Sequence, residues 1–174
     1  MRASLSFARV SAEAGQRTRG TLIAGNLRLP CALGKSGVGI KRRDGDGVTP
    51  GGSHGLRKLW FKGGGPRPRT GLPIRLTRAG DIWCDDPKHR LYNRPAKLPF
   101  KASHEAMRRD DALYDFVIEV DWNIRPRVRG RGSAIFIHIA REGFSPTAGC
   151  VALRARDMRK LLPLIGRRTK LVVA

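Results

Sequence analysis

Two residues in the carboxyl-terminal part of the chain, His138 and Cys150, have side chains that together could attack a peptide bond. A cysteine attacks a carbonyl carbon as its thiolate, and a nearby imidazole can remove the thiol proton. The two residues lie twelve positions apart, which is enough for a strand to end and a loop to turn back. Gly149 permits a turn that points its own amide and that of Cys150 at a developing oxyanion. The alternative is that both side chains simply pack in the core.

The segments around these residues indicate how they are positioned. Residues 133–140, SAIFIHIA, are apolar on both faces, as in a central strand, and the strand period places Phe136 and His138 on the same side. Beyond the cysteine, apolar residues recur at helical spacing and predict an amphipathic helix that begins near Ala155. A proline inside this segment is expected to shorten the helix, and residues 169–173 are expected to form a strand.

The rest of the chain has the pattern of short strands and turns. A Gly-Asn pair at 25–26 separates two apolar runs and predicts a hairpin, and LRKLWFK at 56–62 predicts another strand. Residues 114–122 alternate in polarity and predict a strand with one buried face. The turn-rich segment 74–101 is expected to lie at the surface. We therefore expect a mainly β fold, in one domain that spans residues 1–174.

Charge and motifs narrow the function classes. The net charge of +21 favours an anionic partner, which leaves nucleic acid, anionic lipid or an acidic polymer. A basic nucleic-acid-binding protein is only the second hypothesis, because no known DNA- or RNA-binding motif is present and aromatic residues make up only 6%. Without CxxC, His-x-His, HExxH or P-loop spacing, we expect no metal, nucleotide or other cofactor. The first twenty residues lack a recognisable secretory signal, and no segment is long and apolar enough to span a membrane.

Several other side chains could contact a substrate. Trp83, Asp85 and Asn93 lie in the polar segment DIWCDDPKHRLYNRP, where the acid could bind an amine and the amide could bind peptide groups; capping of turns is the alternative. Arg141 lies between the candidate base and nucleophile and could bind a carboxylate, or it could be a solvated loop residue. Tyr114 is either a substrate contact or an aromatic of the core.

The order of these features resembles the catalytic domain of L,D-transpeptidases, the YkuD family. That family has an upstream histidine, then a Ser or Thr three residues before the nucleophile, then Gly-Cys and an aliphatic residue. The segment GKSGVGIKRRDGDGVTPGG is similar to a second family segment, a hundred residues earlier. The matching positions are His138, Thr147, Gly149, Cys150 and Val151, and in the earlier segment Lys41, Asp44, Gly45, Asp46, Gly47, Thr49, Pro50 and Gly52.

The resemblance implies a mixed β-sandwich with one or two short helices, in which Cys150 is the nucleophile and His138 the base. It further implies cross-linking of peptidoglycan stems through a cysteine thioester, with Thr147 among the substrate contacts. The partners are then muropeptides, the location is the periplasm although no signal peptide is recognisable, and we expect a monomer. Water in place of the acceptor amine would give an L,D-carboxypeptidase or endopeptidase, and this alternative stays open.

Two positions depart from the family pattern. Ala148 stands where the family has a histidine, and Ala152 where it has Arg or Asn. These departures are similar to a divergent proteobacterial branch, for which the resemblance implies a cross-link of the L-Ala to diaminopimelate type, the 1,3 type. Substrate recognition is then expected elsewhere, first of all in the segments around Trp83 and Asn93.

Overall fold

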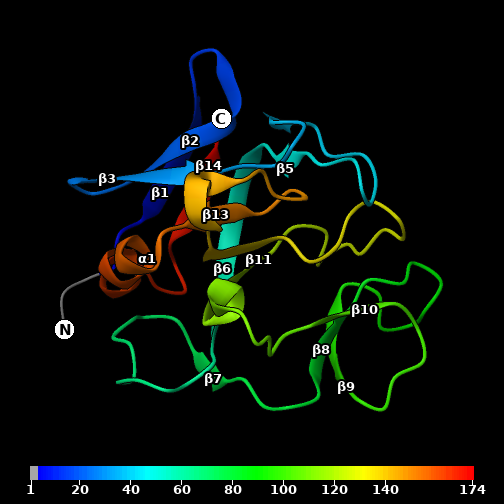
Figure 1. Cartoon of the computed structure of the whole chain (residues 1–174). Helices are drawn as coiled ribbons and strands as arrows, with labels where there is room; N and C mark the ends of the chain where they lie inside the picture. Colours follow the sequence, from blue (N-terminus) through cyan, green and yellow to red (C-terminus); the bar gives the residue numbers. More distant parts are fainter. Residues whose placement is uncertain (1–3) are drawn as a thin grey trace.

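A mixed β-sheet that closes on itself forms the main body of the molecule (Figure 1). The structure is a computed structural model that describes residues 4–174, so residues 1–3 of the predicted domain lie outside the described residues. The strands of this sheet are β1 (Phe7–Glu13), β2 (Gln16–Ala24), β3 (Leu27–Ala32), β6 (Gly52–Phe61), β7 (Ile74–Leu76), β11 (Phe116–Val120), β12 (Phe136–Ile139), β13 (Val151–Leu153) and β14 (Lys170–Val173). Their order is β11-β12-β13-β3-β2-β1-β14-β6-β7, and an additional pairing of β11 with β6 closes the ring. The predicted mainly β class is confirmed.

The strand pairings show why the sheet is mixed. β2 and β3 form the predicted antiparallel hairpin, whose turn contains Gly25 at a φ of +58°. Two pairs of strands are parallel, β1 with β14 and β12 with β13. Parallel neighbours require a long connection, which returns the chain to the end of the sheet where the first strand began. Residues 56–62 were predicted as a strand, and β6 contains them up to Phe61. His138 lies on β12, and Cys150 directly precedes β13. The parallel register of these two strands therefore positions both residues.

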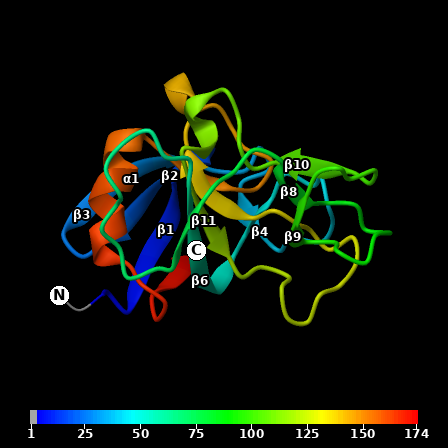
Figure 2. The ribbon, with the colours of Figure 1, turned by 90° about the horizontal axis from the view of Figure 1, so that it is seen from below.

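One apolar core fills the closed sheet. It includes Leu22, Leu59, Ile137 and Leu153, all of which are fully buried. The predicted helix is α1 (Ala155–Leu161), and its apolar face adds to this core. The proline shortens the helix as predicted, because α1 ends at Leu161 and Pro163 lies in the following 3-10 turn η3 (Leu162–Leu164). Figure 2 shows α1 lying beside β1 and β3, on the far side of the molecule from β8–β10.

A second, smaller sheet corrects the prediction that residues 74–101 lie at the surface. It has the order β10-β8-β9, formed by β8 (Asp81–Cys84), β9 (Arg94–Lys97) and β10 (His104–Ala106). All four residues of β8 are buried. Trp83 and Met107 of this region pack with Trp60, Phe136 and Cys150 in a second apolar cluster. The prediction was wrong because turn-rich composition does not show which short strands a neighbouring layer covers.

The same second layer changes the interpretation of residues 114–122. The strand β11 is shorter than predicted, and all five of its residues are buried, so it does not have one exposed face. Glu119 is buried because it accepts a hydrogen bond of 2.5 Å from Trp60 Nε1. Tyr114 lies before the strand, in the 3-10 helix η1 (Ala112–Tyr114). One face of β11 packs on the main core and the other on the second cluster.

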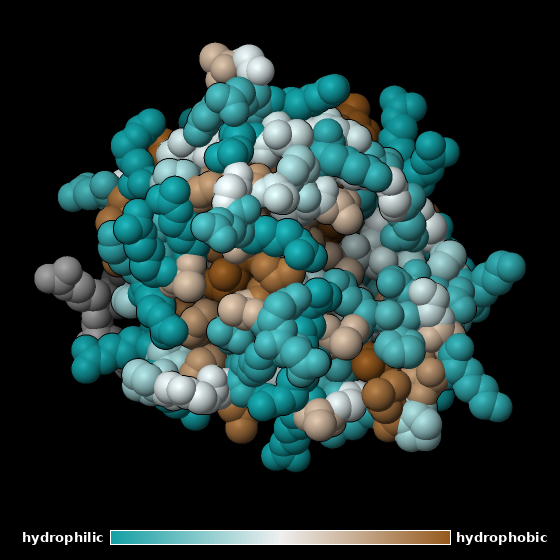
Figure 3. Space-filling view, in the orientation of Figure 1, coloured by the Kyte–Doolittle hydropathy of each residue, from teal (hydrophilic) through white to brown (hydrophobic). Residues whose placement is uncertain are grey.

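Two short strands and a 3-10 helix lie outside the two sheets described above. The short strands β4 (Val38–Gly39) and β5 (Thr49–Pro50) pair with each other, and η2 (Glu142–Phe144) lies in the loop after β12. Figure 3 shows a largely hydrophilic face on which apolar side chains are visible in a hollow near its middle. Within residues 4–174, no helix has the length and apolar character that a membrane crossing requires.

Candidate active site

The Cys150 thiol lies at the amino end of β13, at the wall of a cavity of about 750 Å³. Its sulfur donates to the Ala134 carbonyl at 3.3 Å and accepts from the Phe136 amide at 3.4 Å. Cys150 is only 8% exposed. Burial raises the pKa of the Cys150 thiol to about 12; the negative charge of Glu105 adds to this shift, and the positive charge of Lys41 opposes it. The resting form is therefore the protonated thiol.

His138 lies on the adjacent strand and lines the same cavity. β12 and β13 pair in parallel with His138 opposite Ala152, two residues beyond the cysteine. The ring atom Nδ1 is 2.8 Å from the carbonyl oxygen of Ile139, which requires a proton on Nδ1 and leaves Nε2 as the basic nitrogen. Burial lowers the pKa of His138, so the imidazole is neutral at pH 7. The predicted side of the strand is confirmed, because Tyr114 packs edge-on against both Phe136 and His138.

Thr147 determines the shape of the turn that carries the nucleophile. Its hydroxyl donates to the Cys150 carbonyl at 2.7 Å and accepts from the Gly149 amide at 3.1 Å. The Gly149 amide, which was expected to help hold an oxyanion, therefore already has a partner. The Cys150 amide makes no hydrogen bond to any residue from 4 to 174 and remains as the candidate donor. Gly149 itself is required at this place, because its φ is +139° and a Cβ would lie 2.8 Å from the Val48 carbonyl oxygen.

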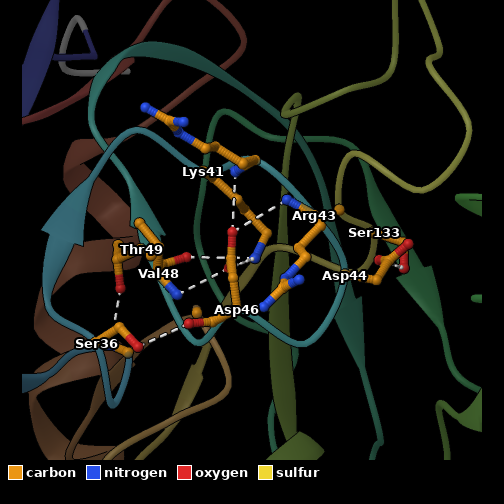
Figure 4. Close-up of polar contacts among 12 residues, drawn as sticks. Ser36, Lys41, Arg43, Asp44, Asp46, Val48, Thr49 and Ser133 are labelled. Carbon is orange, nitrogen blue, oxygen red and sulfur yellow. Dashed lines mark hydrogen bonds and ion pairs between the residues drawn. The ribbon is translucent and has the colours of Figure 1, made fainter.

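A buried ion pair supports the cavity wall next to Gly149 (Figure 4). Lys41 is 3% exposed, and its Nζ donates to Asp46 Oδ1 at 2.7 Å. Asp46 also accepts from the amides of Arg42, Arg43 and Val48 at 2.9, 3.1 and 3.0 Å. Burial acts to raise the pKa of Asp46, but these donors outweigh it and hold the pKa well below its usual range. The segment 41–48 thus folds around the Asp46 carboxylate, which holds the Lys41 ammonium and three backbone amides together.

Trp83 and Asn93 lie behind the cavity wall and do not line it. Their exposed fractions are 2% and 1%. Asn93 Oδ1 accepts from Trp83 Nε1 and from the Ala134 amide, both at 3.1 Å, while its Nδ2 donates to the carbonyls of Trp122 and Asn123. The structure therefore does not place these two side chains where a substrate could touch them. Asn93 instead supports Ala134, whose carbonyl holds the Cys150 sulfur.

The other predicted substrate contacts do line the cavity. Asp85, Tyr114, Arg141 and Thr147 share it with His138 and Cys150. Sequence reasoning missed six more polar side chains of the lining, for which no motif in the sequence gives a signal. They are Ser103, His104, Glu105, Arg109, Ser133 and Ser145.

Asp44, in the loop of residues 41–48, makes two further contacts with side chains outside this loop. Asp44 accepts from Tyr92 O–H at 2.5 Å and from Ser133 O–H at 3.0 Å, the latter drawn in Figure 4. Across residues 4–174, no group of three or more His, Cys, Asp or Glu side chains has the arrangement of a metal site.

Comparison with known proteins adds one finding. The model of the YkuD family, described as the L,D-transpeptidase catalytic domain, matches residues 13–173. This range contains every residue that lines the cavity. A search of curated protein sequences gave no match.

Proposed function

Because the chain belongs to the L,D-transpeptidase catalytic domain family, we propose that it cross-links peptidoglycan peptide stems through a thioester on Cys150. Members of this family act on such stems. The observation that carries the proposal is the single cavity shared by Cys150 and His138, with Nδ1 of the histidine held by the Ile139 carbonyl. This hydrogen bond keeps Nε2 free for proton transfer, which is the requirement for a thiol and imidazole to act together.

The first half-reaction forms the thioester. His138 Nε2 takes the Cys150 proton as the sulfur forms a bond to the donor carbonyl carbon, and the Cys150 amide donates to the oxyanion. The C–N bond then breaks, and the imidazolium gives its proton to the leaving amine. Proton transfer and attack are coupled, because the buried thiol and the neutral imidazole do not form an ion pair at rest.

The second half-reaction forms the cross-link. An amine of the acceptor stem attacks the thioester carbonyl, His138 removes a proton from the attacking nitrogen, and the sulfur leaves and takes that proton back. Water in place of the amine gives hydrolysis, the L,D-carboxypeptidase or endopeptidase alternative. The same proposal includes a cross-link of the 1,3 type, in which the thioester carries L-Ala of the donor stem and the new bond joins that L-Ala to diaminopimelate of the acceptor.

Recognition of the stems belongs to the cavity lining. Arg141 is exposed at the cavity and carries no ion pair within residues 4–174, so it binds a stem carboxylate in this proposal. Asp85, Tyr114 and Thr147 supply the remaining contacts. With Ala148 and Ala152 unable to take part in polar recognition, these side chains replace the polar neighbours of the nucleophile. Action on this substrate further implies a periplasmic enzyme that works as one catalytic domain.

The test uses purified disaccharide-tetrapeptide as donor and acceptor. Mass spectrometry is expected to show a covalent adduct on Cys150 and muropeptide dimers, and fragmentation of the dimers assigns the bond cut. Cys150→Ala is expected to abolish both products. Cys84→Ala is the matched control, because Cys84 is also buried but does not line the cavity.

The outcomes separate the alternatives. Monomeric products without dimers would favour the hydrolase. No adduct and no product with the wild-type protein, or full activity after Cys150→Ala, would overturn the proposal.

A further inference from the structure

Glu105 is a carboxylate in the same cavity as the nucleophile, and no sequence motif identified it. It lies on β10, in the smaller sheet. Its Oε1 accepts a short hydrogen bond from Tyr114 O–H. No residue from 4 to 174 donates to Oε2. Among residues 4–174, the buried side-chain polar atoms without a hydrogen-bond partner are Thr77 Oγ1 and Trp122 Nε1. Glu105 Oε2 also has no partner in this part of the chain but is not one of these buried atoms, so it is accessible from the cavity.

Among the described residues, no cation of the lining forms an ion pair with Glu105. Arg109 is held by Asp111 through hydrogen bonds of 3.0 and 2.8 Å, and Lys41 is held by Asp46. Within residues 4–174, neither Glu105 nor the neighbouring Asp85 forms an ion pair. Burial raises the pKa of Glu105; the hydrogen bond from Tyr114 and the positive charge of Arg109 oppose this shift, and the charge of Asp85 adds to it. This end of the cavity therefore holds two carboxylates that form no ion pair with a residue from 4 to 174, in a protein with a net charge of +21.

The charge of Glu105 also acts on the nucleophile, because it contributes to the raised pKa of Cys150. An anion beside a cysteine that must attack as thiolate opposes the first half-reaction. A cation bound at Glu105 would remove that opposition. The chemistry of this end of the cavity thus suits a ligand that brings positive charge into the site.

We propose that Glu105, assisted by Asp85, binds the primary ammonium group of the acceptor stem. This inference rests on the function proposed above and names the residue that selects an amine over water. Tyr114 orients the carboxylate through Oε1, and Oε2 faces the ammonium. Arg141 is available for the carboxylate that accompanies an amino-acid ammonium group.

The reaction of the bound ammonium group with the thioester conserves protons and bonds. Glu105 takes one proton from the bound ammonium, which leaves a neutral amine. Its nitrogen forms a C–N bond with the thioester carbon, a second proton passes to His138 Nε2, the C–S bond breaks, and the sulfur takes the proton from His138. Glu105 then releases its proton to solvent, so one ammonium proton is lost for each cross-link formed.

The experiment compares Glu105→Gln with wild type by separating the two half-reactions. Disaccharide-tetrapeptide is the donor, and disaccharide-tripeptide with a free diaminopimelate amine is the acceptor. Glu105→Gln is expected to lower the ratio of cross-linked to hydrolysed product by about tenfold, as for loss of one charged hydrogen bond, and to raise KM for the acceptor. Thioester formation is expected to be retained, and alkylation of Cys150 by iodoacetamide at fixed pH is expected to become faster. Loosened packing would also speed alkylation of the buried thiol, so an unchanged free energy of unfolding in urea is required before the faster rate is assigned to the lost charge.

Controls keep the outcomes distinct. Glu142→Gln makes the same charge change at an exposed residue outside the lining and is expected to leave the product ratio unchanged. Glu105→Asp, which keeps the charge, is expected to retain part of the preference for amine, and it replaces Glu105→Gln if that variant does not fold. An unchanged product ratio and acceptor KM in Glu105→Gln, with thioester still formed, would overturn this inference alone. Absence of thioester in the wild type would overturn the proposed function as well.

Discussion

The charge states of Cys150 and His138 determine how the proposed reaction must begin. The thiol is held between the Ala134 carbonyl and the Phe136 amide, and burial raises its pKa to about 12. Burial lowers the pKa of the neighbouring imidazole. The pair is therefore neutral at rest, unlike the thiolate–imidazolium pairs of cysteine enzymes whose nucleophile has a low pKa. A neutral thiol reacts slowly with oxidants and other electrophiles, so the free enzyme is expected to be alkylated slowly near pH 7.

A first prediction concerns the pH dependence of thioester formation. Only neutral His138 can take the thiol proton, and its folded-state pKa is lower than the ordinary value of 6.5. The acidic limb of kcat/KM for thioester formation is therefore expected below pH 6.5. Alkylation of free enzyme by iodoacetamide is expected to keep rising above pH 9, because the Cys150 pKa is about 12. An acidic limb at pH 7 or above would contradict this assignment.

The same shift affects stability, with a definite sign. Because the pKa of His138 is lower in the folded state, the unfolded chain binds the proton more readily in acid. The free energy of unfolding is therefore expected to fall as pH drops below the unfolded pKa. Urea unfolding of wild type and His138→Asn at pH 5 and pH 7 isolates this contribution, since carboxylates with lowered pKa values affect both proteins equally. An equal pH difference in the two proteins would count against it.

At the scale of elements, two loops from distant parts of the chain hold each other in place. Thr147 exchanges backbone hydrogen bonds with Leu33 and Lys35, at 2.9 Å each. The Gly34 amide donates to Thr49 Oγ1 at 2.8 Å. The loop that carries the nucleophile is thus fixed to the segment after β3 and, through it, to the 41–50 loop. Loops that position reacting groups need such long-range support to hold a productive geometry.

A prediction at this scale concerns the buried ion pair. Asp46→Asn leaves the Lys41 ammonium buried without its anionic partner, and we expect a loss of about 2–4 kcal/mol in the free energy of unfolding. Asp110→Asn, at an exposed position, is the control and is expected to change stability by less than about 0.5 kcal/mol. Urea titration measures both.

The double variant Lys41→Met with Asp46→Asn tests the cause. Removing both charges is expected to recover part of the lost stability, because the desolvated ammonium is then gone. Thioester formation is expected to be slower than in the wild type, since Asp46 also accepts hydrogen bonds from three backbone amides of the loop. A double variant no more stable than Asp46→Asn would show that these amide contacts, rather than the ion pair, carry the effect.

At the scale of the whole molecule, charge is distributed in two ways. The chain has 35 Lys and Arg against 14 Asp and Glu, and the space-filling view shows a largely hydrophilic face. The cavity lining has both signs, with Asp44, Asp85 and Glu105 beside Lys41, Arg109 and Arg141. A basic exterior attracts an acidic polymer, while the carboxylates inside favour a positively charged group of that polymer. This arrangement suits a substrate that bears both carboxylates and amines.

The exterior charge gives a prediction on binding. Retention of the protein on purified sacculi is expected to fall steeply as NaCl rises from about 0.05 M to about 0.5 M, because exposed charges are screened over short distances at high salt. A pelleting assay measures the bound fraction. Cys150→Ala is expected to show the same salt dependence, since the thioester takes no part in this attraction. Binding that does not respond to salt would contradict an electrostatic origin.

Local patterns in the sequence predicted much of the fold. The hairpin at 25–26, the helix from Ala155, the terminal strand and the strand that carries His138 all follow from periodicity, glycine and proline. These signals depend on neighbours a few residues apart, which a sequence contains directly. Segment 74–101 was misread because burial of its short strands depends on a layer formed by other parts of the chain.

For the site, the sequence by itself determined the residue types that can react: a thiol behind a glycine, and a histidine on an adjoining strand. Only the tertiary structure decided their surroundings. It places Trp83 and Asn93 behind the wall, gives the Gly149 amide to Thr147, and brings Glu105 into the cavity. The physical reason is that burial, hydrogen-bond partners and charge depend on contacts across a hundred residues. Spacing along the chain does not encode these contacts.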